Sequence, residues 1–343
     1  MIAPSHIKNM HRDGMSIVAE ADVGHFRFTA WADTILHVSY WPDASEEPLP
    51  MWGIRPRPDD APPLELAATD DGWLLTMPRL RTRVRAGAAE CVFADADGAH
   101  LTALKQVQMT PVRISGEETF HTYATFRASP GEAYYGLGQH QRDWMDHSHW
   151  DVRLWHDYKA EGGEIIAIPF LVTNKGYGVV WDNTARSSIF PGGNGQTIWW
   201  SEVGEAVSFF LIVGAEADDI YAGYRQLTGP TPLPPKAALG YIQCKQRYKT
   251  QQELLEVGRT YREKGYPCDI LVVDWFHWRT LGDMDLNREQ WPDPAAMNCE
   301  LRNQGFQVMI SCWPRFMKDS GHYDTLAANG WFMRDAWGDT LYG

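Results

Sequence analysis

The sequence predicts two domains of different class, an N-terminal β-sandwich followed by the first βα units of a (β/α)8 TIM barrel. Three observations predict this fold class. Residues 1–228 contain short runs in which apolar and polar residues alternate with period two, a proline-rich segment follows at 229–236, and strands alternate with helices over 237–343. We therefore expect a sandwich domain, a linker and the start of a barrel domain at these three ranges.

The sandwich prediction rests on strand-length runs that turn signals separate. Glycine-containing turns are expected at Asp71-Gly72, at Asp97-Gly98 and over 192–195. Many short strands with few helices are typical of an antiparallel sandwich, and one helix is expected near 217–227, at the end of the domain. The clearest strands are FRFTAW (26–31), TILHVSYW (34–41), LRTRVRA (80–86) and TIWWSE (197–202).

The second domain reads as successive βα units. Apolar strands are expected at 237–243, 269–273 and 306–310, so their starts are 32 and 37 residues apart, as βα units require. Four prolines in 230–235 keep the preceding linker extended. A complete barrel takes about 250 residues. Because 107 residues follow position 236, we expect this chain to hold an incomplete barrel with exposed strand edges.

Helix start and stop signals support the same units. Thr250 and Glu253 are spaced as a capping box, in which each side chain accepts a hydrogen bond from the other residue's backbone amide. Asp293 is an N-cap candidate with Pro294 in the first helical position, and Gly305 supplies the stop. The sequence therefore predicts helices that begin at about 250 and 293.

Composition excludes several classes of partner. The 343 residues carry 31 Lys and Arg against 44 Asp and Glu, a net charge of −13 that opposes binding to nucleic acid or to an anionic membrane. Neither a secretory signal nor a run of eighteen apolar residues is found. The five cysteines are scattered without a C-x-x-C pair. We expect a cytoplasmic protein, and a periplasmic location stays open if a signal segment was removed.

The aromatic content points to a binding cleft. The chain has 16 Trp, 14 Tyr and 13 Phe, more than core packing ordinarily requires, although most individual Trp are expected in the core and at interfaces. The stretch ILVVDWFHW (270–278) places Asp274 directly after a buried strand and among Trp275, Phe276 and Trp278. Sugars present flat C–H faces to rings and hydroxyls to carboxylates. A carbohydrate cleft is therefore expected at the carboxyl end of this strand.

Asp274 has a second reading that the sequence leaves open. Its carboxylate could accept hydrogen bonds from two sugar hydroxyls, since charge-assisted bonds fix orientation as well as affinity. Alternatively, Asp274 caps the following segment or pairs with Arg247 or Arg279.

The stretch HQRDWMDHSHWDVRLWHD (140–157) offers four His and four Asp as potential metal ligands. Three readings stay open for it: a substrate-facing loop, an ordinary surface loop and a metal site. The neighbouring GLGQHQ lacks the third glycine of a dinucleotide-binding motif and opens no helix, so that reading is rejected.

Five stretches together resemble glycoside hydrolase family 31, the α-glucosidase and α-xylosidase family. The order and spacing of the family's motifs are preserved over about 130–316; QCKQRYKT and MISCWPRF are more similar to the xylosidase and transglucosylase branches. The stretches are YYGLGQ (134–139), IPFLVTNKGYGVVWDN (168–183), LTGPTPLPPKAALG (227–240), GYPCDILVVDWFHW (265–278) and WPDPAAMNCELRNQGFQVMISCWPRF (291–316).

The resemblance implies retaining hydrolysis of α-linked sugars through a covalent glycosyl-enzyme, with one aspartate as nucleophile and a second as acid and base. The family's nucleophile motif, Lys or Trp, one residue, Asp, two residues, Glu, is absent from 237–343, where the barrel strands are expected. No catalytic residue is therefore assigned, and both aspartates are expected beyond residue 343. Asp283, Asp285 and Asp293 are expected to shape the cleft rim or to cap a helix.

The resemblance also implies the substrate-binding residues. Asp274 matches the acid that binds the distal hydroxyls of the non-reducing sugar. Trp275 and Phe276 match positions that influence whether a hydroxymethyl group fits, Gln246 falls at the end of the first barrel strand, and Trp313 at the end of the third. The expected partner is an α-linked oligosaccharide or α-glycoside, with no cofactor and no metal, and a homo-oligomer stays open.

Two other functions fit the same residues. A noncatalytic carbohydrate-binding protein would keep the sandwich and the partial barrel without the catalytic acids. An α-transglycosylase would share every residue named and differ in preferring a sugar to water as acceptor. Whether the gene continues past Gly343 with a strand that ends in the expected Asp motif separates an enzyme from the noncatalytic protein.

Overall fold

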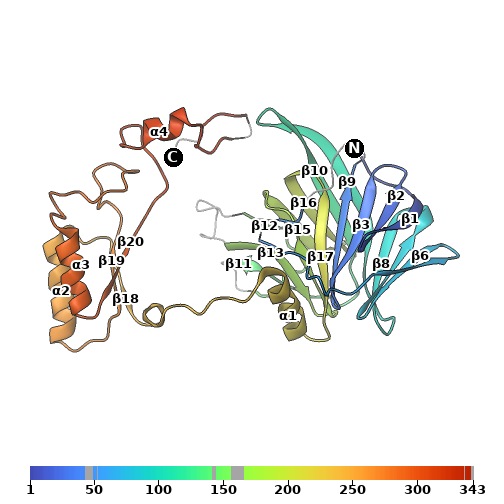
Figure 1. Cartoon of the computed structure of the whole chain (residues 1–343), viewed down its shortest axis with the longest axis horizontal. Helices are drawn as coiled ribbons and strands as arrows, with labels where there is room; N and C mark the ends of the chain where they lie inside the picture. Colours follow the sequence, from blue (N-terminus) through green and yellow to red (C-terminus); the bar gives the residue numbers. More distant parts are fainter. Residues whose placement is uncertain (43–48, 52, 141–143, 156–165, 336, 341–343) are drawn as a thin grey trace. The chain divides into compact units, whose positions relative to one another are not determined.

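The computed structural model describes residues 1–42, 49–51, 53–140, 144–155, 166–335 and 337–340. The chain divides into two compact units, Met1–Thr231 and Pro232–Gly343, each with its own hydrophobic core (Figure 1). Within the described part of the chain, no helix has the length and apolar character needed to cross a membrane.

The first unit consists of two antiparallel sheets packed face to face (Figure 1). The eight-stranded sheet has the order β1-β2-β3-β4-β17-β14-β13-β11, and the nine-stranded sheet has the order β12-β15-β16-β10-β9-β8-β7-β6-β5. A short 3-10 helix, η1 (Ala86–Ala88), joins β7 to β8. The strands are β1 (Ile7–Asp13), β2 (Ser16–Ala21), β3 (His25–Ala32), β4 (Ile35–Trp41), β5 (Glu65–Thr69), β6 (Gly72–Met77), β7 (Leu80–Arg85), β8 (Glu90–Asp95), β9 (His100–Ile114), β10 (Glu117–Arg127), β11 (Tyr134–Gln139), β12 (Val152–Leu154), β13 (Ile166–Thr173), β14 (Tyr177–Trp181), β15 (Ser187–Gly193), β16 (Gln196–Gly204) and β17 (Val207–Val213).

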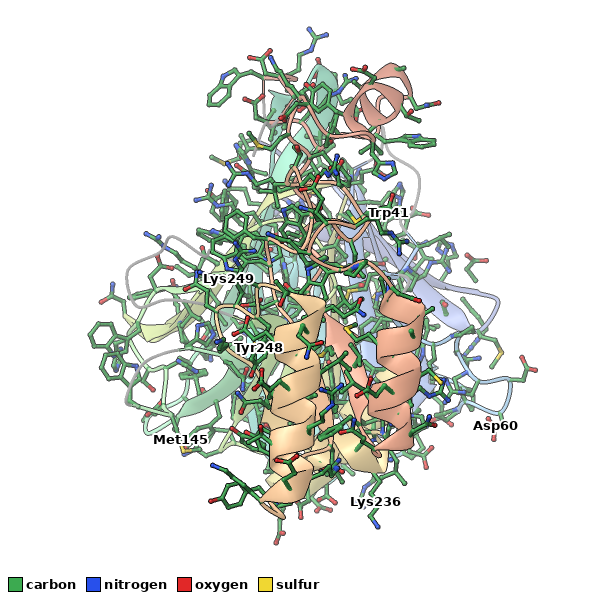
Figure 2. All side chains as sticks on the ribbon, turned by 90° about the vertical axis from the view of Figure 1, so that its left-hand side faces the viewer. Trp41, Asp60, Met145, Lys236, Tyr248 and Lys249 are labelled. Atoms are coloured by element: carbon green, nitrogen blue, oxygen red, sulfur yellow. The ribbon has the colours of Figure 1, made fainter. Side chains whose placement is uncertain are left out.

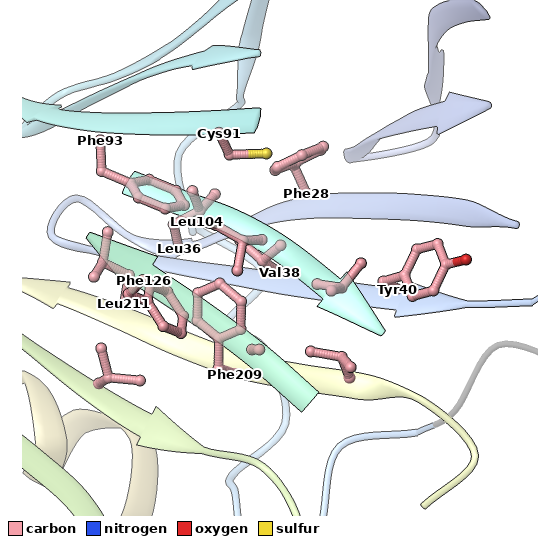
Figure 3. Close-up of a cluster of buried hydrophobic side chains, with 14 of the residues drawn as sticks. Phe28, Leu36, Val38, Tyr40, Cys91, Phe93, Leu104, Phe126, Phe209 and Leu211 are labelled. Atoms are coloured by element: carbon pink, nitrogen blue, oxygen red, sulfur yellow. The ribbon is translucent and has the colours of Figure 1, made fainter. Parts of the chain in front are cut away.

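The sandwich core forms where the inner faces of the two sheets meet. Phe209 of β17 packs edge-on against Phe126 of β10, with ring centroids 5.1 Å apart, and against Phe93 of β8 at 6.4 Å (Figure 3). All three rings are buried. Because strand side chains alternate between faces, the period-two runs of the sequence supply one apolar residue in two to this core.

Strand β17 departs from this alternation because both of its faces are covered. All seven of its residues are buried. Phe209 and Leu211 point into the sandwich, whereas Phe210 and Ile212 join a second cluster with Ile220 of helix α1 (Ala217–Thr228). Helix α1 therefore covers the outer face of the eight-stranded sheet, which explains the uninterrupted apolar sequence of the strand.

The second unit contains three parallel strands with helical crossovers. The sheet order is β18-β19-β20, and Ile270 of β19 pairs with Ile242 of β18 and with Gln307 of β20. In chain order the elements are the 3-10 helix η2 (Lys236–Leu239), β18 (Ile242–Gln243), α2 (Gln251–Glu263), β19 (Ile270–Val273), α3 (Pro294–Asn303), β20 (Gln307–Ile310) and α4 (Tyr323–Ala328).

Helices α2 and α3 lie side by side against one face of this sheet (Figures 1 and 2). Their shared core buries Leu254 of α2, Leu301 of α3 and Leu271 of β19. Gly258 allows the two helices to approach closely, because a Cβ at this position would lie 2.8 Å from Leu301 Cδ2. Figure 2 shows Tyr248 and Lys249 beside the first turn of α2.

Both predicted fold components are confirmed: an N-terminal sandwich and a parallel βα region typical of a barrel. Helix α1 is confirmed, as are the strands at 26–31, 34–41, 80–86 and 197–202. Asp293 caps α3 as predicted, since its Oδ1 accepts a hydrogen bond from the Ala296 amide at 2.9 Å.

Two local predictions are wrong in part. A strand was expected over 237–243, but the segment begins as η2 and pairs as a strand only at Ile242–Gln243. Only half of the capping box forms: Thr250 Oγ1 accepts from the Glu253 amide, whereas Glu253 accepts from the amide of Lys249 rather than that of Thr250. The Glu253 carboxylate also binds Lys245 Nζ at 2.7 Å, which draws it toward the preceding loop.

Phe209→Ala should lower the free energy of unfolding of the first unit by about 3–5 kcal/mol, because it leaves a cavity between two other rings. Denaturant unfolding measures this change. Met15→Ala is the control, since the Met15 side chain is 46% exposed and should change stability by at most about 0.5 kcal/mol. Equal effects of the two substitutions would contradict the assigned core.

Candidate functional site

The carboxyl ends of β19 and β20 place two predicted site segments side by side. The Ser311 amide donates to the Val273 carbonyl at 3.0 Å, so the ladder continues one residue past β20. In a barrel this edge of the sheet carries the active site. The segments that follow, 274–278 and 311–316, therefore share one edge of the second unit.

Asp274 follows the face of β19 that points away from the helices. Leu271 and Val273 are buried in the core with α2 and α3, so strand alternation puts Ile270, Val272 and then Asp274 on the opposite face. Cys244 directly follows the paired strand β18, two residues after Ile242. Burial and, secondarily, the charge of Asp274 raise the pKa of the Cys244 thiol, which places the two side chains near each other.

The alternative pairings considered for Asp274 do not form. Arg247 Nη1 donates instead to the Phe276 carbonyl at 2.8 Å, and Arg279 Nη2 donates to Glu289 Oε1 at 2.8 Å. Among the described residues, the Asp274 carboxylate makes neither a hydrogen bond nor an ion pair. Its side chain is half-buried, so the carboxylate is accessible to a ligand hydroxyl.

Three predicted aromatic residues form a continuous group of rings. Trp275 stacks on Trp313 with centroids 5.0 Å apart and planes inclined by 21°, and it contacts Phe276 at 4.2 Å. Phe276 and Trp313 are exposed, at 45% and 42%. Trp278, by contrast, is buried, so it can line a wall but offers no open ring face.

Gln246 lies apart from these contacts. It is exposed in the loop that follows β18, and within the described residues its side chain makes no hydrogen bond to Asp274, Trp275 or Trp313. The structure therefore brings together four of the five predicted binding residues and leaves the fifth on the neighbouring loop.

The turn after Asp274 has an uncommon backbone conformation. Phe276 has φ 61°, in the left-handed region, which costs an L-residue roughly 1–2 kcal/mol. The ring of His277, which is buried, bonds through Nδ1 to the Asp274 carbonyl at 3.0 Å. Burial lowers the pKa of His277, and the nearby Asp274 opposes this only in part, so the ring is neutral at physiological pH and Nδ1–H donates.

The other acids of this region have structural roles or no described partner. Asp283 joins two loops, since its Oδ1 accepts from the Gly321 amide at 2.9 Å and its Oδ2 from the Thr280 amide at 3.3 Å. Asp293 caps α3. Asp285 is exposed and makes no hydrogen bond or ion pair to another described residue.

The His- and Asp-rich stretch of the first unit binds its own backbone where it is described. His140 Nε2 bonds to the Leu137 carbonyl at 3.0 Å and His147 Nε2 to that of Gly136 at 3.2 Å. Asp146 accepts from the amides of Tyr134 and Ser148, which holds the loop against β11. Asp143, His156 and Asp157 lie outside the described residues. In the remainder, no group of three or more His, Cys, Asp or Glu could hold a metal ion.

Two polar residues organise the strand ends through contacts that the sequence did not predict. Arg247 was named as an ion-pair partner of Asp274, and its hydrogen bond to the Phe276 carbonyl was not expected. The Gln243 side chain accepts from the hydroxyls of Tyr241 at 2.8 Å and Tyr261 at 2.6 Å, and it donates to that of Tyr248 at 2.9 Å. A polar residue inside the short apolar run at 237–243 was the available signal for Gln243.

Comparison with known proteins gives two matching family models. The "Glycosyl hydrolases family 31 TIM-barrel domain" matches residues 231–343, and the "Glycosyl hydrolase 31 N-terminal galactose mutarotase-like domain" matches 25–189. Both units thus match models of one family.

Two curated relatives align with about three-fifths of the chain. An α-xylosidase of Saccharolobus solfataricus is 35% identical over 223 residues, 62% of this chain and 30% of that protein. An uncharacterized family 31 glucosidase, ORF2 of Pseudescherichia vulneris, is 34% identical over 209 residues, 61% of this chain and 38% of that protein. This chain therefore spans well under half of the length of either relative.

Solved structures share the fold over nearly the whole chain. A GH31 α-xylosidase from a soil metagenome, complexed with xylose, has a TM-score of 0.85 at 24% identity, covering 95% of this chain and 50% of that one. A GH31 dextranase of Flavobacterium johnsoniae has a TM-score of 0.85 at 17% identity, covering 99% of this chain and 44% of that one. The order of a sandwich followed by the βα units of a partial barrel is therefore shared with these structures.

His277→Phe should flatten the pH dependence of stability of the second unit. The folded-state pKa of His277 is lowered, so its contribution is full above the unfolded value of about 6.5 and is lost as pH falls toward the folded pKa. Unfolding free energies at several pH values between about 7 and 5 measure the slope. Equal slopes for the two proteins would show that His277 is not held neutral.

Asp283→Ala should accelerate amide hydrogen exchange at Gly321, because the substitution removes the carboxylate that accepts its hydrogen bond. Exchange followed in peptides that cover 316–322 measures the change. Asp285→Ala is the matched control, since Asp285 is an exposed acid two residues away, and it should leave exchange unchanged. Similar exchange in both variants would mean that Asp283 does not join the loops.

Proposed function

Because the chain belongs to glycoside hydrolase family 31, we propose that the protein acts on α-linked sugars as an α-xylosidase or α-glucosidase. The observation that carries this proposal is the Asp274 carboxylate, which has no partner among the described residues. It lies at the carboxyl end of a parallel strand, where Trp275 stacks on Trp313 at 5.0 Å. A carboxylate beside an accessible ring suits a sugar, whose hydroxyls and C–H faces lie at right angles.

Each residue has a distinct role in the proposed subsite. Asp274 accepts hydrogen bonds from two sugar hydroxyls, and its charge strengthens them. The stacked pair of Trp275 and Trp313 contacts a C–H face of the sugar, and the exposed Phe276 ring limits the space for a hydroxymethyl group. Gln246, on the neighbouring loop, supplies amide contacts to a hydroxyl.

The proposed reaction is a double displacement with retention of configuration. One aspartate forms a covalent glycosyl-enzyme while a second protonates the leaving oxygen, with carboxyl groups about 5–5.5 Å apart. Water then releases the sugar, assisted by the second aspartate as base. We assign neither role to Asp283 or Asp293, because their carboxylates accept hydrogen bonds from backbone amides at loop and helix positions.

The names of the relatives support both xylose and glucose as the sugar of the proposed substrate. One of the two curated relatives reported above is named an α-xylosidase and the other a glucosidase. A single change in the pocket wall beside Phe276 could exchange xylose for glucose. We therefore propose the α-glycoside class and leave the two sugars to the assay.

We also propose a cytoplasmic location. All five cysteines are free in the structure, with Cys91 and Cys268 buried, and reduced thiols suit a reducing compartment.

Asp274→Ala in the full-length gene product should lower kcat/KM for an aryl α-xyloside or aryl α-glucoside by about thirtyfold to a thousandfold, since a lost charged hydrogen-bond partner costs roughly 2–4 kcal/mol. Initial rates with both substrates measure this. Asp285→Ala should leave the rates unchanged. A decrease below about threefold for Asp274→Ala would remove this residue from the subsite.

Product analysis in the same assays separates the remaining functions. Free sugar with retained configuration supports hydrolysis. Transfer products in excess of free sugar would indicate an α-transglycosylase. Sugar binding without cleavage of either substrate would indicate the noncatalytic alternative and overturn the proposed hydrolase.

A further inference from the structure

We propose that Arg247 is a positioning residue of the sugar site, holding the Asp274–His277 turn in the conformation that presents Asp274 and Trp275. This inference rests on the proposed function for its meaning, but its physical basis lies entirely within the second unit. In this proposal Arg247 acts on Asp274 indirectly, by holding the turn. The sequence had instead suggested a direct ion pair between Arg247 and Asp274.

The turn needs external support because of Phe276. A bulky L-residue at φ 61° occupies a conformation that glycine and asparagine adopt far more readily. Such residues persist where surrounding contacts fix them, and they concentrate at ligand sites. The contacts around Phe276 therefore identify what keeps the turn in place.

Arg247 makes two contacts with this one residue from the loop that follows β18. Its Nη1 donates to the Phe276 carbonyl at 2.8 Å, and its guanidinium carbon lies 5.5 Å from the centroid of the Phe276 ring. The carbonyl and the ring face are both electron-rich, so one cation binds backbone and side chain together. These contacts fix the carbonyl direction and the ring position, which are the two features that a left-handed residue changes on relaxing.

Contacts with Phe276 and within its turn determine where the neighbouring site residues lie. Its ring contacts Trp275 at 4.2 Å, and Trp275 in turn stacks on Trp313 at 5.0 Å. On the other side, His277 Nδ1 bonds to the Asp274 carbonyl at 3.0 Å, so the turn moves as a unit. Loss of Arg247 should therefore shift the Trp275 ring and reorient Asp274 together.

The geometry also explains why Arg247 leaves the Asp274 charge accessible. The guanidinium is engaged by the Phe276 carbonyl and ring, and no ion pair joins it to Asp274 among the described residues. If Arg247 bound Asp274 instead, a sugar hydroxyl would have to displace it. Arg247 thus supports the subsite without neutralising its acid.

A double-mutant cycle in the full-length gene product tests this proposal. Arg247→Ala should lower kcat/KM for the aryl α-glycoside that is cleaved by about tenfold, mainly through KM, because the turn relaxes. Phe276→Gly removes the ring contact and adopts the left-handed conformation without strain, so the turn no longer needs the arginine. In that background, Arg247→Ala should lower kcat/KM by less than about twofold.

The cycle separates positioning from direct contact. If Arg247 itself touched the sugar, its removal would cost the same factor in the wild type and in the Phe276→Gly variant, and the proposal would be overturned. Arg247→Lys should recover little, because an ammonium cannot reach the carbonyl and lie over the ring in the same geometry. Arg279→Ala is the matched control: its exposed ion pair with Glu289 should contribute almost nothing.

A second measurement does not depend on activity. The stacked Trp275–Trp313 pair should give an exciton couplet in circular dichroism, identified as the component that Trp313→Phe removes. Arg247→Ala should remove most of the same component while the melting temperature stays close to that of the wild type. An unchanged couplet would overturn the proposal. If the wild type cleaves neither glycoside, the proposed function fails, yet this spectrum still decides the role of Arg247.

Discussion

Strand alternation in β19 is the constraint on which the candidate site depends. Leu271 and Val273 must face α2 and α3, because the only core of this unit that the described residues form lies there. Because side chains alternate between the two faces of a strand, Ile270, Val272 and Asp274 then lie on the face away from the helices. A shift of one residue would bury the Asp274 carboxylate among apolar side chains at a high desolvation cost. The stability of the helix layer thus fixes the direction of the proposed sugar-binding acid.

Past the strand ends, the loops hold one another rather than being fixed by their own sequences. Arg247, after β18, binds Phe276, after β19. Asp283, after β19, accepts from Gly321, after β20, and the Leu281 carbonyl accepts from the Met317 amide at 3.0 Å. Each loop is therefore linked to the next around the sheet edge. Strand β19 sets the direction in which the Asp274 side chain points. The three linked loops together hold the backbone around it in position.

Local signals explain how much of the fold could be predicted. Alternation identified the sandwich strands, and the Asp293-Pro294 pair identified the start of α3, because N-cap and first-turn preferences act within four residues. The failures are non-local. Glu253 was expected to close a capping box, but Lys245 attracts its carboxylate from eight residues away. The left-handed backbone of Phe276 could not be predicted from the local sequence, since this conformation is usually indicated by glycine or asparagine.

Candidate site residues could be chosen from the sequence only where the position of a residue, and not the composition of the chain, selected it. Among the 15 described tryptophans, six are buried and five are exposed, so an abundance of Trp says little about any one of them. Trp181 and Trp199 stack at 5.2 Å inside the sandwich core, much as Trp275 and Trp313 stack at the strand ends. Ring contact alone therefore does not mark a ligand platform. What distinguishes the second pair is that each ring follows a parallel strand at its carboxyl end, beside an acid whose charge no described residue neutralises.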